Sequence, residues 1–186
     1  MAHNSEVIDV VDKDDNVIEK KMRTDLLPTD IIRVASCFVI DAAWNILIAQ
    51  RSENKLKNPN KWSSAVSETV QTGEEYTTAA VRGAQEEISL CIREQDLLFQ
   101  EKIYQPSDNS RDVFKTWYVV LCSEDQKKSL KKQENEVQEL RRVSMEELCQ
   151  LIEDHPEQYS SSLPKMLQVR KQHRDEILAV LLSPNK

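Results

Sequence analysis

Residues 68–90, with the sequence ETVQTGEEYTTAAVRGAQEEISL, constrain the fold of this chain more than any other stretch. Gly73 and Glu74 interrupt the chain in the manner of a loop. After this loop, residues that can face a core recur at helical spacing: Tyr76, Ala80, Ala84 and Ile88. We therefore predict a loop followed by a helix that packs one face on a core.

Two acidic residues, Glu86 and Glu87, are neighbours near the end of this predicted helix. Adjacent residues on a helix lie about 100° apart around its axis, so both carboxylates can lean toward one point. A hard cation prefers oxygen ligands of this kind and often shares them with a phosphate. The pattern therefore favours a cation site at the loop and helix.

The same stretch resembles the Nudix box, G-x5-E-x7-R-E-U-x-E-E-x-G-U, in which U is apolar. The register is given by the positions that match the pattern: Glu74, Arg82, Ala84, Glu86, Glu87 and Leu90. Glu68 and Ser89 depart from the pattern, because each stands where the box has a glycine. Gly83 also departs, since it stands where the box has the glutamate after the arginine.

This resemblance implies a divergent Nudix hydrolase that acts on a small molecule containing a diphosphate, such as an X-linked nucleoside diphosphate. The cofactor it implies is Mg²⁺ or Mn²⁺, and the implied metal ligands are Glu74, Glu86 and Glu87. The implied catalytic residues are Arg82, Glu86 and Glu87. In this assignment the arginine orients the carboxylates through charge-assisted hydrogen bonds.

Gly83 is the departure with the largest consequence, because the family's glutamate at this position binds metal or activates the attacking water. One alternative is a hydrolase that takes a carboxylate from elsewhere: Glu134, Glu136 and Glu139 are candidates, and each also suits a solvated loop. Glu68 is another candidate, with a loop-tip residue as its simpler interpretation. The other alternative is a catalytically impaired member that binds a diphosphate-containing ligand or a protein partner. If the site is otherwise intact, Gly83→Glu is expected to raise hydrolysis.

Beyond the box, the chain is similar to the Nudix branch that contains type I isopentenyl-diphosphate isomerase, and to small bacterial Nudix hydrolases with the same N-terminal hairpin. Lys21, Arg51 and Lys55 match the basic positions with which that isomerase holds its diphosphate. The alternative is that Arg51 and Lys55 are only solvated. The isomerase's cysteine, histidines and later glutamates correspond to other residue types: Ser67, Asp25, Ile32, Thr69, Phe114 and Thr116. Isomerisation of an alkene needs an acid and a base, so isomerase activity is disfavoured.

The composition fits one soluble domain over residues 1–186, with 39% hydrophobic and 31% charged residues. The net charge of −7 argues against a broad nucleic-acid surface, and no apolar run is long enough to cross a membrane. The four cysteines are widely spaced, which favours a reducing cytoplasm over a disulfide framework. The expected partner is therefore a small molecule, and the resemblance is compatible with a homodimer.

The order of apolar segments predicts an α+β fold, which the resemblance specifies as a Nudix-type α/β/α sandwich with a mixed sheet and flanking helices. An N-terminal hairpin is predicted over 6–21, a second hairpin over 33–41 and 45–52, and further strands over 64–70, 97–105, 112–122 and 137–143. The charged segment 123–136 is predicted to be a loop. Ser144 and Glu147 predict a capping box that begins the C-terminal helices of residues 144–182.

Overall fold

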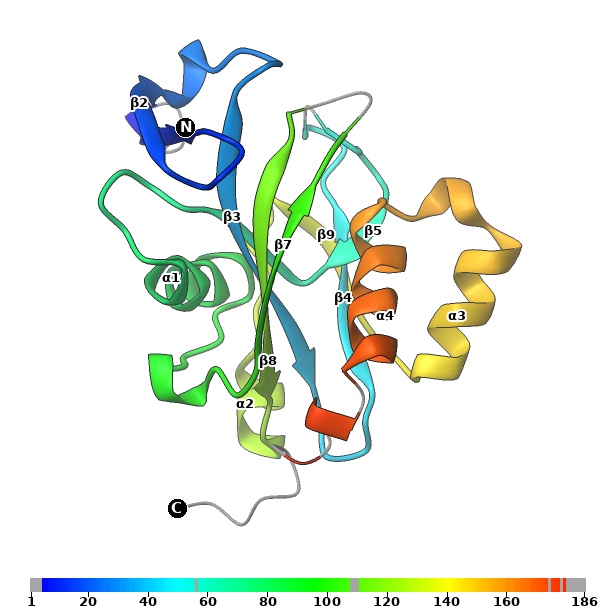
Figure 1. The fold of residues 1–186 in the computed structure, drawn as a ribbon. Coiled ribbons are helices and arrows are strands. Elements are labelled where there is room, and N and C mark those ends of the chain that lie inside the picture. Colours follow the sequence, from blue (N-terminus) through cyan, green and yellow to red (C-terminus); the bar gives the residue numbers. More distant parts are fainter. Residues whose placement is uncertain (1–4, 56, 108–110, 174, 178, 180–186) are drawn as a thin grey trace.

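A computed structural model of the chain describes residues 5–55, 57–107, 111–173, 175–177 and 179. In these residues, one mixed sheet contains the following strands: β1 (Val7–Val11), β2 (Val17–Met22), β3 (Ile31–Ile40), β4 (Ile46–Arg51), β5 (Trp62–Ser64), β6 (Val66–Thr69), β7 (Gln100–Gln105), β8 (Val113–Leu121) and β9 (Val137–Val143). Helix α1 (Tyr76–Ile88) lies on one side of the sheet, and α3 (Met145–Asp154) and α4 (Ser162–Gln172) lie on the other (Figure 1). This arrangement confirms the predicted α+β architecture.

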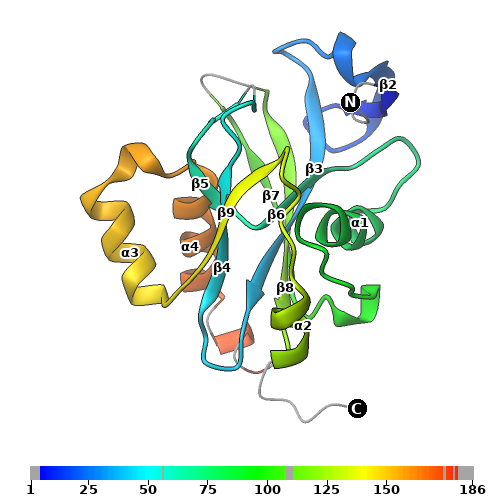
Figure 2. The same cartoon turned by 180° about the vertical axis from the view of Figure 1, so that it is seen from behind.

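Strand β3 organises the sheet, because it has partners along both edges. It runs parallel to β8 from Ile32 to Ile40, and antiparallel to β6 from Val34 to Cys37. It meets β4 only beside the turn, at Ile40 and Ile46. Strand β4 instead pairs with β5 and β9, which lie beside it in Figure 2. The predicted hairpin is therefore confirmed at the turn between β3 and β4, but away from the turn the two strands pair with other strands instead of with each other.

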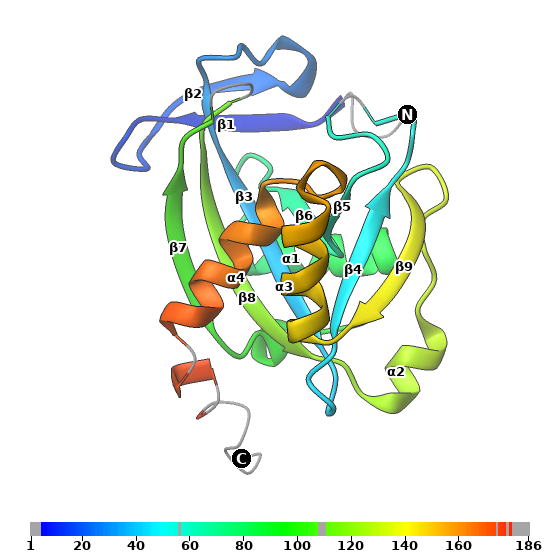
Figure 3. The ribbon, with the colours of Figure 1, turned by 90° about the vertical axis from the view of Figure 1, so that its right-hand side faces the viewer.

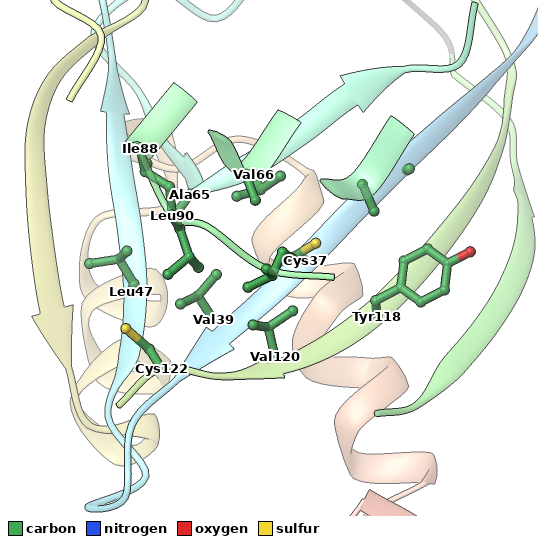
Figure 4. Close-up of a cluster of buried hydrophobic side chains, with 14 of the residues drawn as sticks. Cys37, Val39, Leu47, Ala65, Val66, Ile88, Leu90, Tyr118, Val120 and Cys122 are labelled. Carbon is green, nitrogen blue, oxygen red and sulfur yellow. The ribbon is translucent and has the colours of Figure 1, made fainter. Parts of the chain in front are cut away.

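The residues of β3 alternate between two cores, as the two-residue period of a strand requires. Ala35, Cys37 and Val39 belong to the cluster under α1, which Figure 4 shows. Phe38 and Ile40 belong to the cluster under α3 and α4, which also contains buried residues of β8 and both helices: Trp117, Val119, Leu148, Leu163 and Met166. Figure 3 shows α3 and α4 crossing the front of the strands with α1 behind.

Helix α1 fits closely to the sheet because its buried face carries small residues: Ala79, Ala80, Gly83 and Ala84. The helix ends at Ser89, which has φ 55° in the left-handed region where the Nudix box has glycine. The Ser89 N–H donates to the Gln85 carbonyl at 3.1 Å, and the Leu90 N–H donates to the Ala84 carbonyl at 2.9 Å. Serine therefore completes the helix end that glycine favours.

Some predicted elements differ from the structure. The segment 123–136 contains a helix, α2 (Glu124–Ser129), so the prediction of a loop was wrong there; Ser123 and Gln126 cap the helix reciprocally. The predicted strand 64–70 is divided into β5 and β6 at Ala65. The Ser144 side chain accepts from the Glu147 N–H at 3.1 Å as expected, but the Glu147 carboxylate pairs with Arg141 at 2.6 Å.

At the ends of the chain, the N-terminal hairpin predicted over 6–21 is confirmed by the antiparallel pairing of β1 and β2. The predicted helix to residue 182 extends past the end of α4 at Gln172, and residues 174, 178 and 180–182 of that prediction lie outside the described residues. Among the helices that the structure describes, none combines the length and hydropathy that a membrane crossing needs.

Replacing Ala84 with leucine is expected to lower the free energy of unfolding by about 1–3 kcal/mol, because a packed core has no space for the added atoms. Ala84 is fully buried in the cluster under α1. The control Gln85→Leu lies on the exposed side of the same helix and is expected to change the free energy by no more than about 0.5 kcal/mol. Urea unfolding followed by circular dichroism measures both, and equal losses would contradict tight packing at Ala84.

Candidate functional site

Arg82 of α1 connects the helix to the loop that precedes it. Its guanidinium donates to both carboxylate oxygens of Glu74 at 3.0 Å, and to the carbonyl of Thr69 at 3.0 Å. It also pairs with Glu86 at 3.3 Å and with Glu68 at 3.5 Å. Burial alone lowers the pKa of Arg82, but the bonds to Glu74 and the nearby carboxylates raise it overall. Arg82 is therefore a permanent cation that orders several acidic side chains.

The two neighbouring glutamates, Glu86 and Glu87, have different partners in the structure. The Glu86 side chain is 45% exposed and pairs with Arg82. The Glu87 side chain instead turns toward β6, where its Oε1 accepts from the Ser67 N–H at 2.9 Å. Since Arg82 contacts both Glu74 and Glu86, the metal-binding roles predicted for these two residues stay predictions.

The Glu87 carboxylate lies in surroundings that disfavour its negative charge. Burial raises the pKa of Glu87 to about 8, and the carboxylates of Glu68 and Glu136 contribute in the same direction. The Ser67 N–H and the ammonium of Lys55 oppose this rise. A cation placed beside Glu87 would therefore relieve an existing electrostatic cost.

Two of the three predicted diphosphate ligands lie near this carboxylate. The pKa of Arg51 is lowered by burial and raised by Glu87 and Glu136, so its guanidinium lies within electrostatic reach of both carboxylates. The Arg51 Nε donates to the carbonyl of Lys57 at 2.9 Å. Lys55 pairs with Glu136. The structure therefore brings Arg51 and Lys55 to Glu87.

The third predicted ligand, Lys21, has other partners. Its ammonium donates to the two carboxylate oxygens of Asp30 at 2.9 and 3.1 Å, and pairs with Glu19 at 3.2 Å. The bond to Asp30 raises the pKa of Lys21. A role for Lys21 in holding a diphosphate stays a prediction.

Sequence reasoning did not single out Lys115, which lies on β8 and is only 5% exposed. Burial lowers the pKa of Lys115 to about 8, while the charge of Glu87 raises it and those of Arg51 and Lys165 lower it further. Its Nζ lies 4.4 Å from the centroid of the Trp117 ring. The available signal was a lysine inside an otherwise apolar strand, because lysines are almost never buried without a special reason.

Further basic residues surround Arg51. The pKa of Lys57 is lowered by burial and then by the positive charges of Arg111, Arg23 and Arg51. Burial raises the pKa of Glu68, and the positive charge of Arg23 is one of the contributions that oppose this rise. Arg23, Arg51, Lys57 and Arg111 form a basic cluster, in which Arg23 is paired with Glu6 at 2.5 Å. The positive charges around Lys57 repel one another, so an added anion would stabilise them.

Of the later acidic residues predicted as sources of a carboxylate, only Glu136 is partly buried, whereas Glu134 and Glu139 are exposed. The loop that carries Glu136 is joined to the end of α1, since the Gln133 N–H donates to the carbonyl of Glu87 at 3.1 Å. It is also joined to β4, because the Ser52 N–H donates to the carbonyl of Glu136 at 2.9 Å. These bonds explain why Glu136 reaches Glu87 electrostatically.

Within the described residues, no three histidine, cysteine, aspartate or glutamate side chains form a ready metal-binding group. Mg²⁺ does not require such a cage, since it is often held by one or two carboxylates, waters and the oxygens of a bound phosphate. Glu87 has a partly buried carboxylate with like charges nearby, and Arg51, Lys55 and Lys115 interact with it electrostatically. The residues present therefore fit a divalent cation that binds together with a diphosphate.

Comparison with known proteins agrees with this fold. A family model for the NUDIX domain matches residues 31–166. A solved crystal structure of a protein from Deinococcus radiodurans superposes with a TM-score of 0.70 at 24% sequence identity, and the match covers 88% of this chain and 98% of that protein. At this identity the structural likeness shows the fold alone.

Two curated relatives carry names related to prenyl diphosphates. The prenyl-diphosphate phosphatase of Methanosarcina mazei is 27% identical over 158 residues, which cover 84% of this chain and 90% of the phosphatase. The isopentenyl-diphosphate Delta-isomerase 1 of Photorhabdus laumondii is 29% identical over 106 residues, which cover 56% of this chain and 59% of the isomerase. Two relatives named as Nudix hydrolases are matched over about half of their length, 48% and 53%.

The raised pKa of Glu87 predicts a pH-dependent stability when divalent cations are chelated. Between its ordinary value of 4.5 and about 8, the folded chain binds more protons at Glu87 than the unfolded chain does, so stability falls as the pH rises through this window. Over this pH window, the free energy of unfolding is expected to fall by on the order of 2 kcal/mol more in the wild type than in Glu87→Gln. Urea unfolding at several pH values measures it.

The control for this measurement is Glu153→Gln, because Glu153 is an exposed residue on α3. It is expected to keep the pH dependence of the wild type. Parallel curves for the wild type and Glu87→Gln would contradict the strained position of the Glu87 carboxylate.

Proposed function

The chain belongs to the Nudix family, and on that premise we propose that it is a divergent hydrolase of a small molecule that contains a diphosphate, with Mg²⁺ or Mn²⁺ as its cation. An X-linked nucleoside diphosphate or a similar compound is the proposed substrate class. The observation that carries this proposal is the position of Glu87, whose partly buried carboxylate lies within electrostatic reach of Arg51, Lys55 and Lys115. One carboxylate thus faces several cations, as binding of a cation and a diphosphate requires.

In this proposal Glu87 is the main ligand of the cation, and Glu74 and Glu86 are the further ligands. When bound, the cation neutralises charge on the diphosphate and makes a bound water more acidic. Arg82 keeps the carboxylates in place through the contacts described above. Because Arg82 also binds the Thr69 carbonyl, it fixes the carboxylates relative to β6.

Arg51 and Lys55 are proposed to bind the diphosphate oxygens. Lys115 adds a buried amine within electrostatic reach of Glu87, and a charge with little solvent around it interacts more strongly than an exposed one. Lys21 is retained as a further proposed contact, although it would have to exchange its bond to Asp30 for the ligand.

Gly83 favours a second candidate function, a catalytically impaired member that binds a diphosphate-containing ligand or a protein partner. Helix α1 offers no side chain at the position where the Nudix box has a glutamate. Isomerase activity is the least favoured reading, because Ser67, Phe114 and Thr116 stand where the isomerase has its cysteine and glutamates. The name of the Methanosarcina mazei relative supports including prenyl diphosphates among the compounds to be tested.

The remaining expectations concern the setting of the protein. A single Nudix domain over residues 1–186, a cytoplasmic location and a homodimer stay predictions. The wide spacing of the four cysteines supports the cytoplasmic proposal.

Glu87→Gln is expected to lower kcat by about 100-fold or more, because it removes the charge of the main metal ligand while keeping its size and its Ser67 bond. The substrates are nucleoside diphosphate derivatives and prenyl diphosphates, each with Mg²⁺ or Mn²⁺, and phosphorus NMR identifies the products. Turnover that Glu87→Gln leaves unchanged would contradict the hydrolase proposal. A wild type that hydrolyses none of these compounds but binds one of them would favour the second candidate function.

Arg51→Met is expected to raise KM by about 10-fold or more, since it removes a charged donor to the diphosphate but keeps an apolar stem. The matched control is Arg93→Met, whose side chain is 73% exposed and pairs only locally, with Asp96. Arg93→Met is expected to keep the KM of the wild type. Equal values of KM for Arg51→Met and the wild type would remove Arg51 from the diphosphate site.

A further inference from the structure

The Glu68 side chain occupies the space in which a side chain at position 83 would stand. Gly83 lies on the face of α1 that packs against β6, and a Cβ added there would lie 2.7 Å from the Cβ of Glu68. The Cγ1 of Val66 would lie at 3.3 Å and the Cγ of Glu68 at 3.4 Å. Real Cβ atoms essentially never approach within 3.0 Å of another heavy atom, and a Cβ cannot swing away as the end of a flexible side chain can. In this backbone, glutamate at 68 and any larger residue at 83 exclude each other.

The carboxylate of Glu68 lies inside the candidate site. The residue is 5% exposed, and its Oε1 accepts from the Thr69 N–H at 2.8 Å. Its Oε2 lies 3.5 Å from the Arg82 guanidinium. Glu87 follows Gly83 by about one helical turn, and its Oε1 accepts at 2.9 Å from the N–H of Ser67, the residue before Glu68. The side chains of Glu68 and Glu87 therefore both lie at the junction of β6 and α1.

We propose that Glu68 supplies, from β6, the carboxylate that α1 lacks at position 83, and that Glu68 and Glu87 together bind the divalent cation. This inference rests on the proposed function. The Nudix box has glycine at the position of Glu68 and glutamate at the position of Gly83, and this chain has the two residue types exchanged. Gly83 is then one half of an exchange that keeps a carboxylate at the same place between helix and strand.

A purely structural role as a partner of Arg82 explains Glu68 less well. Arg82 already makes two bonds of 3.0 Å to Glu74, one of 3.0 Å to Thr69 and a contact of 3.3 Å to Glu86. The contact with Glu68, at 3.5 Å, is the longest of its ion pairs. The Thr69 N–H satisfies Oε1 of Glu68, but Oε2 has only this long contact with Arg82. A buried carboxylate with one weakly paired oxygen is costly, and a bound cation would offset that cost.

The same geometry argues against the expectation that Gly83→Glu alone raises hydrolysis. The added side chain would overlap Glu68, so the helix or the strand would have to shift. The informative variant is the double exchange, Glu68→Gly with Gly83→Glu, because it removes the obstacle and returns a carboxylate from the helix side.

The test measures the binding of Mn²⁺ alone, by electron paramagnetic resonance of the free ion, without substrate. Glu68→Gln and Glu68→Gly are each expected to weaken Mn²⁺ binding by about 10-fold or more. The double exchange is expected to return the affinity to within about threefold of the wild type, because it again places one carboxylate between helix and strand. Glu153→Gln on α3 is the matched control and is expected to bind as the wild type does.

Unchanged Mn²⁺ affinity in Glu68→Gln would overturn the inference, as would a wild type that binds no Mn²⁺. A double exchange that folds, as judged by circular dichroism, but stays weak would overturn it as well. If the double exchange does not fold, the nearly isosteric Glu68→Gln decides. Turnover that depends on Glu87 but not on Glu68 would contradict this inference alone, whereas Mn²⁺ binding through Glu68 without any turnover would contradict only the proposed function.

Discussion

The close approach of α1 to β6 is the contact on which the rest of the site depends. It exists because the buried face of the helix carries alanines and Gly83. A helix held so close to a strand lets Arg82 reach the Thr69 carbonyl, and lets Glu87 accept from the Ser67 N–H. The acidic groups are therefore positioned by backbone contacts of the core, rather than by flexible side chains at the surface.

The charges around this contact are unevenly compensated. Arg82 is paired with carboxylates, while the carboxylates of Glu68 and Glu136 add to the effect of burial in raising the pKa of Glu87. Among the basic groups, burial and the charge of Arg51 lower the pKa of Lys57, and burial lowers that of Lys115. Acidic and basic groups that each lack full compensation are characteristic of sites that bind ligands of both signs, since the ligand completes what the protein leaves unpaired.

Much of the fold was predictable because strands and helices leave periodic patterns, and the box helix and the strand at 112–122 follow theirs closely. The position of Glu87 followed from the box register. Sequence could not show that β3 and β4 separate, because pairing with β8 and β9 is decided by distant segments. Sequence analysis missed Lys115 because the charged groups near it, Glu87 and Arg51, come from other elements of the fold, which the pattern of one strand does not reveal. The high charge of segment 123–136 led to the prediction of a loop. Ser123, followed three residues later by Gln126, is the capping pattern that could have indicated helix α2.

The mutual exclusion at positions 68 and 83 has a consequence for the history of such a site. A form with two glutamates would require the helix or the strand to shift, because a Cβ at position 83 would lie 2.7 Å from that of Glu68. The form with glycine at both positions is sterically open, but it has no carboxylate at either. Given the proposed role of Glu68, single substitutions that lead from one arrangement to the other would therefore pass through a strained or a weakened form.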